Sequence, residues 1–260
     1  MKFSIIIINY NTLEYTQNCL DSIFANLPVE MFELILVDNN SPDGSGQILK
    51  EKYCDRVKTI LNNQNLGFGA ANNQGAKIAQ GEYLWFLNSD TLIDNVNLEE
   101  IDKIFKNNQK LGVTSVDLLM ENRKRQSYAF GEFLSLKNLL KRGNNIGKEC
   151  SGYYKVDWLT GASMIVRREI FNKVSGFDEK FFMYFEDMDL CKRIKESGFE
   201  IWFLKSYSII HFGGKSAVNF EKMKSDYYIS QDYFFLKHYG KFQKFFVRLL
   251  RSIYLFIKNK

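Results

Sequence analysis

Short apolar runs alternate with longer amphipathic stretches over the first third of the chain. Residues 3–8 form a run that is apolar except for Ser4 and rich in β-branched side chains, which predicts a central strand buried on both faces. From Thr12 the apolar positions recur at helical spacing, and Pro28 ends the predicted helix. The same pattern predicts strands at 32–37, 57–61 and 83–87 and helices at 45–53 and 69–79. Strands that alternate with helices indicate an α/β fold, with a mostly parallel central sheet and helices on both faces.

Polar clusters follow several of these predicted strands. Ligands of such sheets bind at the carboxyl ends of the strands, so these clusters are candidate sites. Beyond Asp94 the order of elements is harder to read, and residues 126–154 look like a long polar connection. We expect a catalytic domain over 1–236, with a nucleotide-binding half at about 1–94 and an acceptor half at about 95–236, and then a helix over 237–260.

Composition narrows the class of protein without choosing a function. The chain has 260 residues, of which 45% are hydrophobic and 25% charged, as in globular domains. Its net charge of +5 suits nucleic acid, a membrane surface or a phosphorylated ligand. The four cysteines form no C-x-x-C pair, which argues against a zinc site or a disulfide framework. The first apolar run is too short for a signal peptide, and no stretch reaches the roughly twenty apolar residues of a membrane span, so we expect a cytoplasmic protein.

Two aspartates stand where predicted strands end. Asp38 follows the second strand, where its carboxylate could accept hydrogen bonds from a ribose hydroxyl or a base N–H. Asp90 follows the strand at 83–87, where a carboxylate can hold Mg²⁺ or Mn²⁺ beside the phosphates of a substrate. An aspartate that simply forms a turn is the alternative at both positions.

A glycine-containing turn at 65–73 opens a predicted helix and resembles a dinucleotide-binding fingerprint. Asp90 lies roughly twenty residues beyond it, as a ribose-binding acid would. The match is poor, because Asn72 replaces the third glycine and the first strand leads into Asn9-Tyr10-Asn11 instead of a glycine-rich loop. A nicotinamide-dependent oxidoreductase therefore stays an alternative of low weight.

Acidic residues gather at the start of a predicted helix near position 186. Helix-dipole stabilisation and an i,i+4 pair between Asp189 and Arg193 would explain part of this cluster. They leave unexplained the aromatic run that precedes Glu186 and Asp187. A carboxylate among aromatic side chains can have a pKa suited to proton abstraction.

Two further side chains are candidates for ligand contact. His211 is followed by Gly-Gly, where a ligand can approach the backbone closely, and Lys215 could then contact phosphate. Trp158 could stack on an acceptor sugar. For both aromatic side chains, a place in the core is the alternative.

The order of these motifs resembles that of the family 2 glycosyltransferases of the GT-A fold, over about residues 3–216. Bacterial rhamnosyltransferase-like members are the most similar. The shared motifs are Ile-Asn-Tyr-Asn at 8–11, Val-Asp-Asn-Asn-Ser at 37–41, Asn-x-Gly-Phe at 65–68, Leu-Asn-Ser-Asp-Thr at 87–91, Thr-Gly-Ala at 160–162, Gly-Phe-Asp-Glu at 176–179 and Glu-Asp-x-Asp-Leu-Cys-x-Arg at 186–193.

The resemblance implies transfer of a sugar, with inversion, from a nucleotide diphosphate such as dTDP-rhamnose or a UDP-sugar to an acceptor hydroxyl in cell-surface polysaccharide synthesis. It implies donor contacts by Asn9, Tyr10, Asn11, Asp38, Asn65, Gly67, Asn72, Asn88 and Lys215. It makes Asp187 the general base and puts Glu186, Trp158 and Gly161 on the acceptor side. A non-catalytic carbohydrate-binding subunit is the alternative from another class.

The resemblance also implies that Asp90 and His211 hold Mg²⁺ or Mn²⁺. Members of the family often carry two or three aspartates in the metal motif, whereas here Asn88 and Ser89 precede a single carboxylate. An ion held by one carboxylate, one imidazole and two donor phosphates would bind weakly without the donor.

The end of the chain predicts a basic amphipathic helix. Its basic positions are Lys237, Lys241, Lys244, Arg248 and Arg251, and its apolar positions are Phe242, Phe245, Phe246, Leu249, Ile253, Phe256 and Ile257. Such a helix can lie at a lipid interface, so we expect a peripheral protein that binds anionic membranes and a lipid-linked acceptor, and no nucleic acid. A helix packed on the catalytic domain is the alternative.

Overall fold

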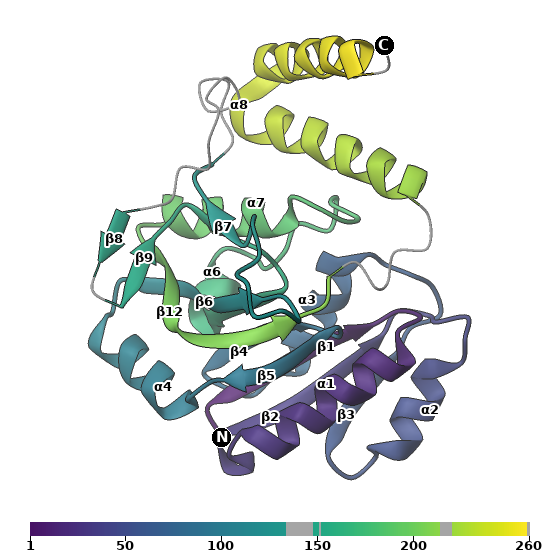
Figure 1. Ribbon diagram of the computed structural model, residues 1–260, viewed down its shortest axis with the longest axis vertical. Coiled ribbons are helices and arrows are strands. Elements are labelled where there is room, and N and C mark those ends of the chain that lie inside the picture. Colours follow the sequence, from purple (N-terminus) through teal and green to yellow (C-terminus); the bar gives the residue numbers. More distant parts are fainter. Residues whose placement is uncertain (134–147, 151, 214–219, 259–260) are drawn as a thin grey trace.

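A computed structural model describes residues 1–133, 148–150, 152–213 and 220–258. Its central sheet separates two layers of helices (Figure 1). One layer contains α1 (Leu13–Asn26), α2 (Ser45–Lys52) and α4 (Leu98–Asn107). The other contains α3 (Phe68–Ile78), α6 (Arg168–Lys173) and α7 (Glu186–Glu196), and α8 (Phe220–Lys258) lies above α7. The expected α/β architecture is confirmed.

The sheet has a parallel half and a mixed half. Its order is β3-β2-β1-β4-β11-β6-β12-β9-β8, and β5 also pairs with β12. The parallel half consists of β1 (Phe3–Asn9), β2 (Phe32–Asp38), β3 (Val57–Leu61) and β4 (Tyr83–Asn88). The mixed half consists of β5 (Thr91–Asn95), β6 (Leu111–Leu119), β8 (Lys148–Cys150), β9 (Tyr153–Lys155), β11 (Ser163–Arg167) and β12 (Glu200–His211). Because β2 and β4 flank β1, successive connections reverse direction beside β1, where α/β sheets bind ligands.

The core forms where the apolar runs of the sequence face both helix layers. Every residue of β2 is buried, and in β1 only Ile8 is partly exposed, as expected for strands covered on both faces. Gly75 lets α3 approach the sheet, since a Cβ there would stand 2.5 Å from Cγ2 of Ile6. The elements predicted up to residue 87 are confirmed.

The segment at 126–154 contains more structure than the predicted polar connection. Within it β7 (Phe130–Gly131) pairs antiparallel with β10 (Trp158–Leu159), and β8 pairs with β9. A strand of two residues is too short to produce a period-2 pattern, so the sequence gives no signal for β7. Residues 134–147 and 151 lie outside the described part of the chain.

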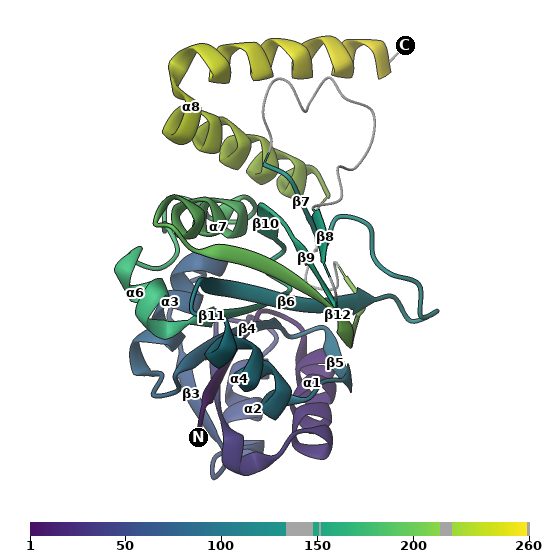
Figure 2. The same cartoon turned by 90° about the vertical axis from the view of Figure 1, so that its left-hand side faces the viewer.

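The last helix begins at Phe220, earlier than the predicted start at residue 237, whereas the domain boundary itself stays a prediction. Its helical geometry is interrupted at Gly240, where φ is 86° and ψ is 178°, and the two arms lie above α7 (Figure 2). The helix packs on the domain through a cluster of Phe181, Phe185, Met188, Phe234, Phe235 and Val247. Among the described residues, no helix has both the length and the hydropathy of a transmembrane span.

Candidate active site

The carboxyl ends of the parallel strands bring the first predicted motifs together. Asn9 at the end of β1 is paired in register with Asp38 at the end of β2, and Ile8 with Asn88 at the end of β4. Asn11, just beyond β1, has a positive φ of 55°, which asparagine tolerates better than most residues. Tyr10 and Asn11 are partly exposed at this edge. They remain available to a donor.

Asn9 holds the turns through hydrogen bonds. Its Nδ2 donates to Asp38 Oδ1 at 2.7 Å and to Ser45 Oγ at 2.7 Å, and its Oδ1 accepts from Thr12 and Thr16. The residue is fully buried. The hydrogen-bonding capacity of this side chain is used within the protein, where it orients Asp38; the donor contact of Asn9 stays a prediction.

Asp38 is oriented by the loop that follows it. Its carboxylate accepts hydrogen bonds from the backbone N–H and the hydroxyl of Ser41 in addition to Asn9. A Cβ at Gly46 would stand 2.3 Å from Cγ of Asp38, so the glycine makes room for this carboxylate. Asp38 is 5% exposed, which leaves only a small surface for a nucleoside.

The first turn of α3 contacts the loop that contains Phe182. The Phe68 N–H donates to the Phe182 carbonyl at 3.0 Å, and a Cβ at Gly67 would stand 2.3 Å from the same oxygen. Asn65 accepts a hydrogen bond from Asn39, which the sequence analysis did not single out. Asn72 is 1% exposed and donates to the Phe68 carbonyl of its own helix, and its place in the donor pocket stays a prediction.

Asp90 and His211 lie side by side. The pairing of β5 with β12 aligns His211 with Thr91, and the backbone N–H of Phe212 donates to the Asp90 carbonyl at 3.0 Å. His211 Nε2 lies 3.3 Å from Asp90 Oδ1 and 3.4 Å from Asn88 Nδ2. Both predicted metal residues and Asn88 therefore meet at one point of the edge.

Gln126 is a neighbour of His211 that the sequence analysis missed. Its Oε1 lies 2.8 Å from His211 Nδ1, and its Nε2 donates to the His211 carbonyl at 2.6 Å. A lone polar residue in a polar segment carries no signal in the sequence.

The chemistry of this pair fits a divalent cation. Two ligands that bind one ion at about 2.1 Å and at right angles lie roughly 3 Å apart, close to the 3.3 Å observed. Among the described residues, no group of three or more His, Cys, Asp or Glu side chains is arranged to hold a metal. The remaining ligands would have to come from a substrate or from water.

The acidic pair at the start of α7 sits on a strained turn. Tyr184 and Phe185 both have positive φ angles, of 70° and 68°, which non-glycine residues rarely adopt. Glu186 is 5% exposed, and its buried Oε2 has no hydrogen-bond partner among the described residues. Burial, reinforced by the charge of Asp187, raises the Glu186 pKa well above its ordinary value.

Asp187 is partly exposed and held by the backbone. Its Oδ2 accepts from the Gly161 N–H at 2.9 Å, and its Oδ1 accepts from the Met188 N–H at 2.7 Å. Burial raises the pKa of this carboxyl more than the backbone hydrogen bonds lower it. A raised pKa suits a base that must accept a proton near neutral pH.

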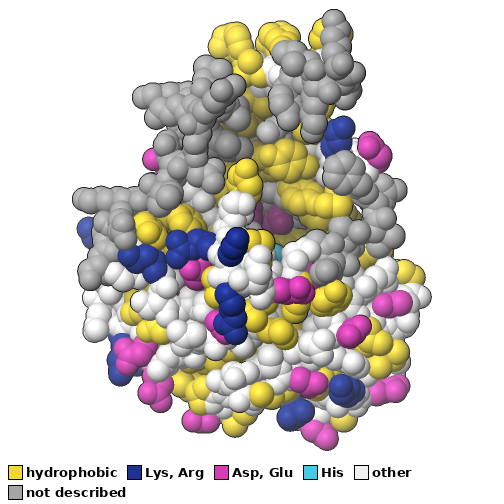
Figure 3. Space-filling view, in the orientation of Figure 1, with side chains coloured by type: hydrophobic (Ala, Val, Ile, Leu, Met, Phe, Trp, Pro, Cys, Tyr) yellow, Lys and Arg dark blue, Asp and Glu magenta, His cyan; other side chains and the backbone are white. Residues whose placement is uncertain are grey.

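The segment at 160–162 connects the two acidic sites. Gly161 donates to Asp187, and the carbonyl of the next residue, Ala162, accepts from the Asn88 N–H at 3.0 Å. In the space-filling view, acidic and imidazole atoms are visible in a hollow beneath apolar side chains (Figure 3). The acidic pair of α7 and the Asp90–His211 pair thus belong to the same region.

Trp158, which the resemblance puts on the acceptor side, is held by a hydrogen bond and by packing. The Trp158 indole N–H donates to the Glu132 carbonyl at 3.0 Å, and the ring packs against both apolar clusters. The side chain is partly exposed. Lys215, the last predicted donor residue, lies outside the described part of the chain.

The helix α8 reaches the acidic helix α7 through Asp189. This fully buried carboxylate accepts from Lys237 at 2.6 Å and His238 at 2.7 Å, and it forms the predicted pair with Arg193. Burial raises the Asp189 pKa, but these partners outweigh it and the pKa is lowered. Lys237 therefore belongs to the catalytic domain, and it is not free to join a basic stripe.

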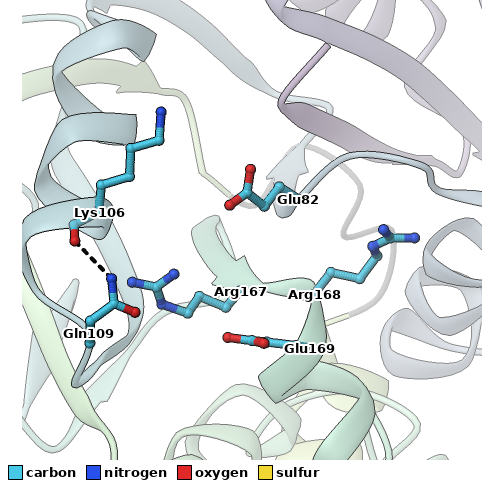
Figure 4. A pocket seen from close by; sticks show the side chains of 6 residues that line it. All are labelled: Glu82, Lys106, Gln109, Arg167, Arg168 and Glu169. Carbon is cyan, nitrogen blue, oxygen red and sulfur yellow. Dashed lines mark hydrogen bonds between the residues drawn. The ribbon is translucent and has the colours of Figure 1, made fainter.

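A separate hollow lies at the opposite ends of the strands (Figure 4). It is lined by Glu82, Lys106, Gln109, Arg167, Arg168 and Glu169. Arg167 is paired in register with Tyr83, the first residue of β4, and donates to backbone carbonyls of Phe105 and Leu111. None of the predicted site residues lines this hollow.

Comparisons with known proteins agree with this geometry. Residues 4–175 match the family described as Glycosyl transferase family 2, and residues 143–214 match the N-terminal domain of galactosyltransferase. The rhamnosyltransferase WbbL of Escherichia coli is 26% identical over 225 residues, which are 80% of this chain and 82% of that protein. An N-acetylglucosaminyl-diphospho-decaprenol L-rhamnosyltransferase of Mycobacterium tuberculosis is 27% identical over 210 residues, with coverages of 68% and 66%.

Solved structures share the fold. Staphylococcus aureus TarS matches with a TM-score of 0.63 and 20% identity over 89% of this chain and 38% of its own. GalNAc-T7, solved with UDP, GalNAc and Mn²⁺, matches with a TM-score of 0.64 and 16% identity over 81% of this chain and 44% of its own. The chain thus spans less than half of each of these two proteins.

These matches confirm the GT-A fold and exclude the oxidoreductase alternative. They also agree with the start of α3, where the Phe182 carbonyl occupies the place at which a dinucleotide phosphate would need a free N–H group. The family match covers more than half of the chain. The chain is a glycosyltransferase that belongs to glycosyl transferase family 2.

Proposed function

We propose that this glycosyltransferase transfers a sugar from a nucleotide diphosphate to an acceptor hydroxyl with inversion, and that it uses a divalent cation. The observation that carries the proposal is the segment at 160–162. It hydrogen-bonds Asp187 with one residue and the end of β4 with the next. A carboxylate base and a cation site in fixed relation to each other are what this displacement requires.

Asp187 acts as the general base. The acceptor oxygen attacks the anomeric carbon and the bond from that carbon to the diphosphate breaks, while Asp187 takes the hydroxyl proton. The two backbone N–H groups that hold its carboxylate keep it oriented. Burial raises the pKa of Glu186 well above its ordinary value, and in its protonated form this carboxyl can donate a hydrogen bond to the acceptor from Oε2, which has no partner among the described residues.

Asp90 and His211 would hold Mg²⁺ or Mn²⁺. When bound, the cation neutralises the negative charge that develops on the departing diphosphate. On the protein side, Asn88 lies beside the same imidazole and can donate to a donor phosphate. Tyr10, Asn11, Asp38 and Asn65 hold the nucleoside, and Lys215 contacts the diphosphate. Trp158 contributes to the acceptor side.

The donor is dTDP-rhamnose or a UDP-sugar, and the acceptor is carried on a lipid in the synthesis of a cell-surface polysaccharide. The names of the rhamnosyltransferases that this chain resembles support rhamnose as the donor sugar, and the decaprenol in one of these names supports a lipid-linked acceptor. TarS, which has the same fold, has been solved with UDP-GlcNAc, so the uridine-linked alternative stays in the proposal.

The second arm of α8 would bind the cytoplasmic face of a membrane. Several of its apolar residues are open to solvent, with exposure of 71% at Phe242, 62% at Phe245 and 65% at Phe256, whereas Val247 is buried against the domain. Lys241 and Lys244 have no ion pair among the described residues, whereas Arg248 and Arg251 both pair with Asp232. The predicted stripe of five basic residues is therefore reduced to two free ones, and apolar contact must supply most of the affinity.

A donor screen tests the proposed function. The protein is incubated with a panel of dTDP- and UDP-sugars with and without Mn²⁺, and release of the nucleoside diphosphate and product mass are measured. We expect release and transfer for one donor class, dependent on the cation, with inverted anomeric configuration by NMR. Binding of a sugar nucleotide without any turnover would favour the non-catalytic alternative instead.

A further inference from the structure

The side-chain amide of Gln126 holds His211 at two points. Nε2 donates to the His211 carbonyl at 2.6 Å, and Oε1 lies 2.8 Å from Nδ1 of the same residue. The first contact fixes the direction of the amide, since a flipped amide would bring two acceptor oxygens together. Because Oε1 then faces the ring, Nδ1 must carry a hydrogen and donate it.

This hydrogen bond decides which ring nitrogen is available. In a neutral imidazole with its hydrogen on Nδ1, Nε2 carries the lone pair. Nε2 is also the atom that lies 3.3 Å from Asp90 Oδ1. Two acceptors that face each other at this distance form a site that a shared cation can occupy.

Gln126 is itself held by the end of β6. Its backbone N–H donates to the Leu118 carbonyl at 2.8 Å. The preceding residue, Arg125, forms a bidentate pair with Asp117 of β6, at 2.6 and 2.8 Å. The amide that contacts His211 is therefore anchored to the sheet on one side.

We propose that Gln126 is a positioning residue for the cation of the donor complex. It keeps His211 in the tautomer and ring orientation in which Nε2 can bind the ion. Gln126 acts through His211, and it does not itself touch the donor. The inference rests on the proposed function, which assigns the cation to Asp90 and His211.

Mn²⁺ binding tests this role directly. Calorimetry and Mn²⁺ EPR are carried out in the presence of the nucleoside diphosphate released in the donor screen. Since loss of the partner of a metal-bound histidine typically weakens affinity about 10- to 100-fold, we expect this loss for Gln126→Leu. The matched control is Gln109→Leu, on the exposed turn near the opposite hollow, which should bind Mn²⁺ like the wild type.

A double-mutant cycle separates positioning from a general structural effect. If Gln126 acts through His211, Gln126→Leu adds no further loss of Mn²⁺ affinity in the His211→Ala background. The chain has two histidines, so ¹⁵N NMR of histidine-labelled protein at pH 8 can also report the tautomer of His211. Gln126→Leu should lose the wild-type signature of a hydrogen on Nδ1.

Unchanged Mn²⁺ affinity in Gln126→Leu would overturn the inference, and so would an equal further loss in the His211→Ala background. Both results leave the proposed function intact. If the wild-type protein transfers sugar but does not bind Mn²⁺ or Mg²⁺, the cation part of the proposed function is wrong and this inference falls with it.

Discussion

The two sides of the candidate site, the proposed donor and acceptor walls, satisfy their polar groups in different ways. The proposed donor wall, formed by the turns after β1 and β2, is a network of hydrogen bonds. The single side chain of Asn9 connects Asp38, Thr16 and Ser45 in it. The proposed acceptor wall, formed by 184–187, has two positive φ angles and a buried carboxyl oxygen that has no partner in the described part of the chain. One wall is preorganised by its own hydrogen bonds, whereas the other keeps unsatisfied groups that a substrate can satisfy.

The comparison predicts the largest effect on the acceptor wall. Asp187→Asn keeps the shape of the side chain but removes the proton acceptor, so kcat should fall by about 10²- to 10⁴-fold. Affinity for the nucleoside diphosphate, measured by calorimetry, should not change, because the donor wall is intact. Asp55→Asn, a change at an exposed aspartate, serves as the control. Transfer at a near wild-type rate would rule Asp187 out as the base.

The acceptor wall also depends on α8, and truncations test this dependence. A chain that ends at residue 236 loses Lys237 and His238 and leaves the buried Asp189 with Arg193. We expect about 3 kcal/mol less stability in urea unfolding, with loss of activity.

A chain that ends at Gly240 keeps both contacts of Asp189 and loses the second arm, including Val247 and the ion pairs of Arg248 and Arg251 with Asp232. It should retain transfer to a soluble acceptor but no longer bind anionic liposomes, whose binding to the full chain should weaken with salt. Equal liposome binding by the full chain and the shorter one would refute the membrane role of the second arm.

On the donor wall, the comparison predicts that one substitution lowers both the stability of the protein and its affinity for the nucleoside diphosphate. Asn9→Ala removes the partners of several buried polar groups, so unfolding free energy should fall by about 1–3 kcal/mol. Because Asp38 loses its orientation, the Kd of the nucleoside diphosphate should rise as well. Asn63→Ala at an exposed position is the control. A stable variant with normal donor affinity would show that the network does not preorganise this wall.

The smallest effect is expected at Glu186, and it depends on pH. Below the ordinary glutamate pKa near 4.5, this carboxyl is protonated in both the folded and the unfolded chain. As pH rises towards the raised pKa of the folded state, the unfolded chain ionises first, so the folded protein loses stability.

Glu186→Gln removes this pH-dependent loss. The variant should be more stable than the wild type by an amount on the order of 1 kcal/mol at pH 8, and the difference should shrink at pH 4. Urea unfolding at both pH values measures it, with Glu121→Gln at an exposed turn as the control. A difference that does not vary with pH would mean that Glu186 ionises normally.

Most of the parallel half of the fold could be predicted from the sequence, because buried strands and the polar residues that follow them give strong signals. It also identified Asp90 with His211 and Asp187 with Gly161, which the structure brings into contact. It could not show that the side chains of Asn9 and Asn72 also hydrogen-bond within the protein.

Other features depend on tertiary contacts that leave no periodic trace. Gln126 was missed because a single side chain docks on a distant strand. The start of α8 was placed too late, because the residues around Phe234 pack on α7 and do not continue the pattern of the exposed arm. The kink at Gly240 lies between the buried Phe235 and the exposed Phe242, and Val247 beyond it returns to the buried cluster.

The contact between Gly67 and the Phe182 carbonyl bears on attempts to redesign donor preference. Any side chain at position 67 would collide with that oxygen and would also have to adopt a φ of 84°. Gly67 is thus constrained by its contact with the loop at Phe182, whichever sugar nucleotide is bound. Libraries aimed at new donors should keep Gly67 and also Asn65, whose Oδ1 accepts a hydrogen bond from the Gly67 N–H. They should vary the partly exposed Tyr10 and Asn11, which do not hold that turn.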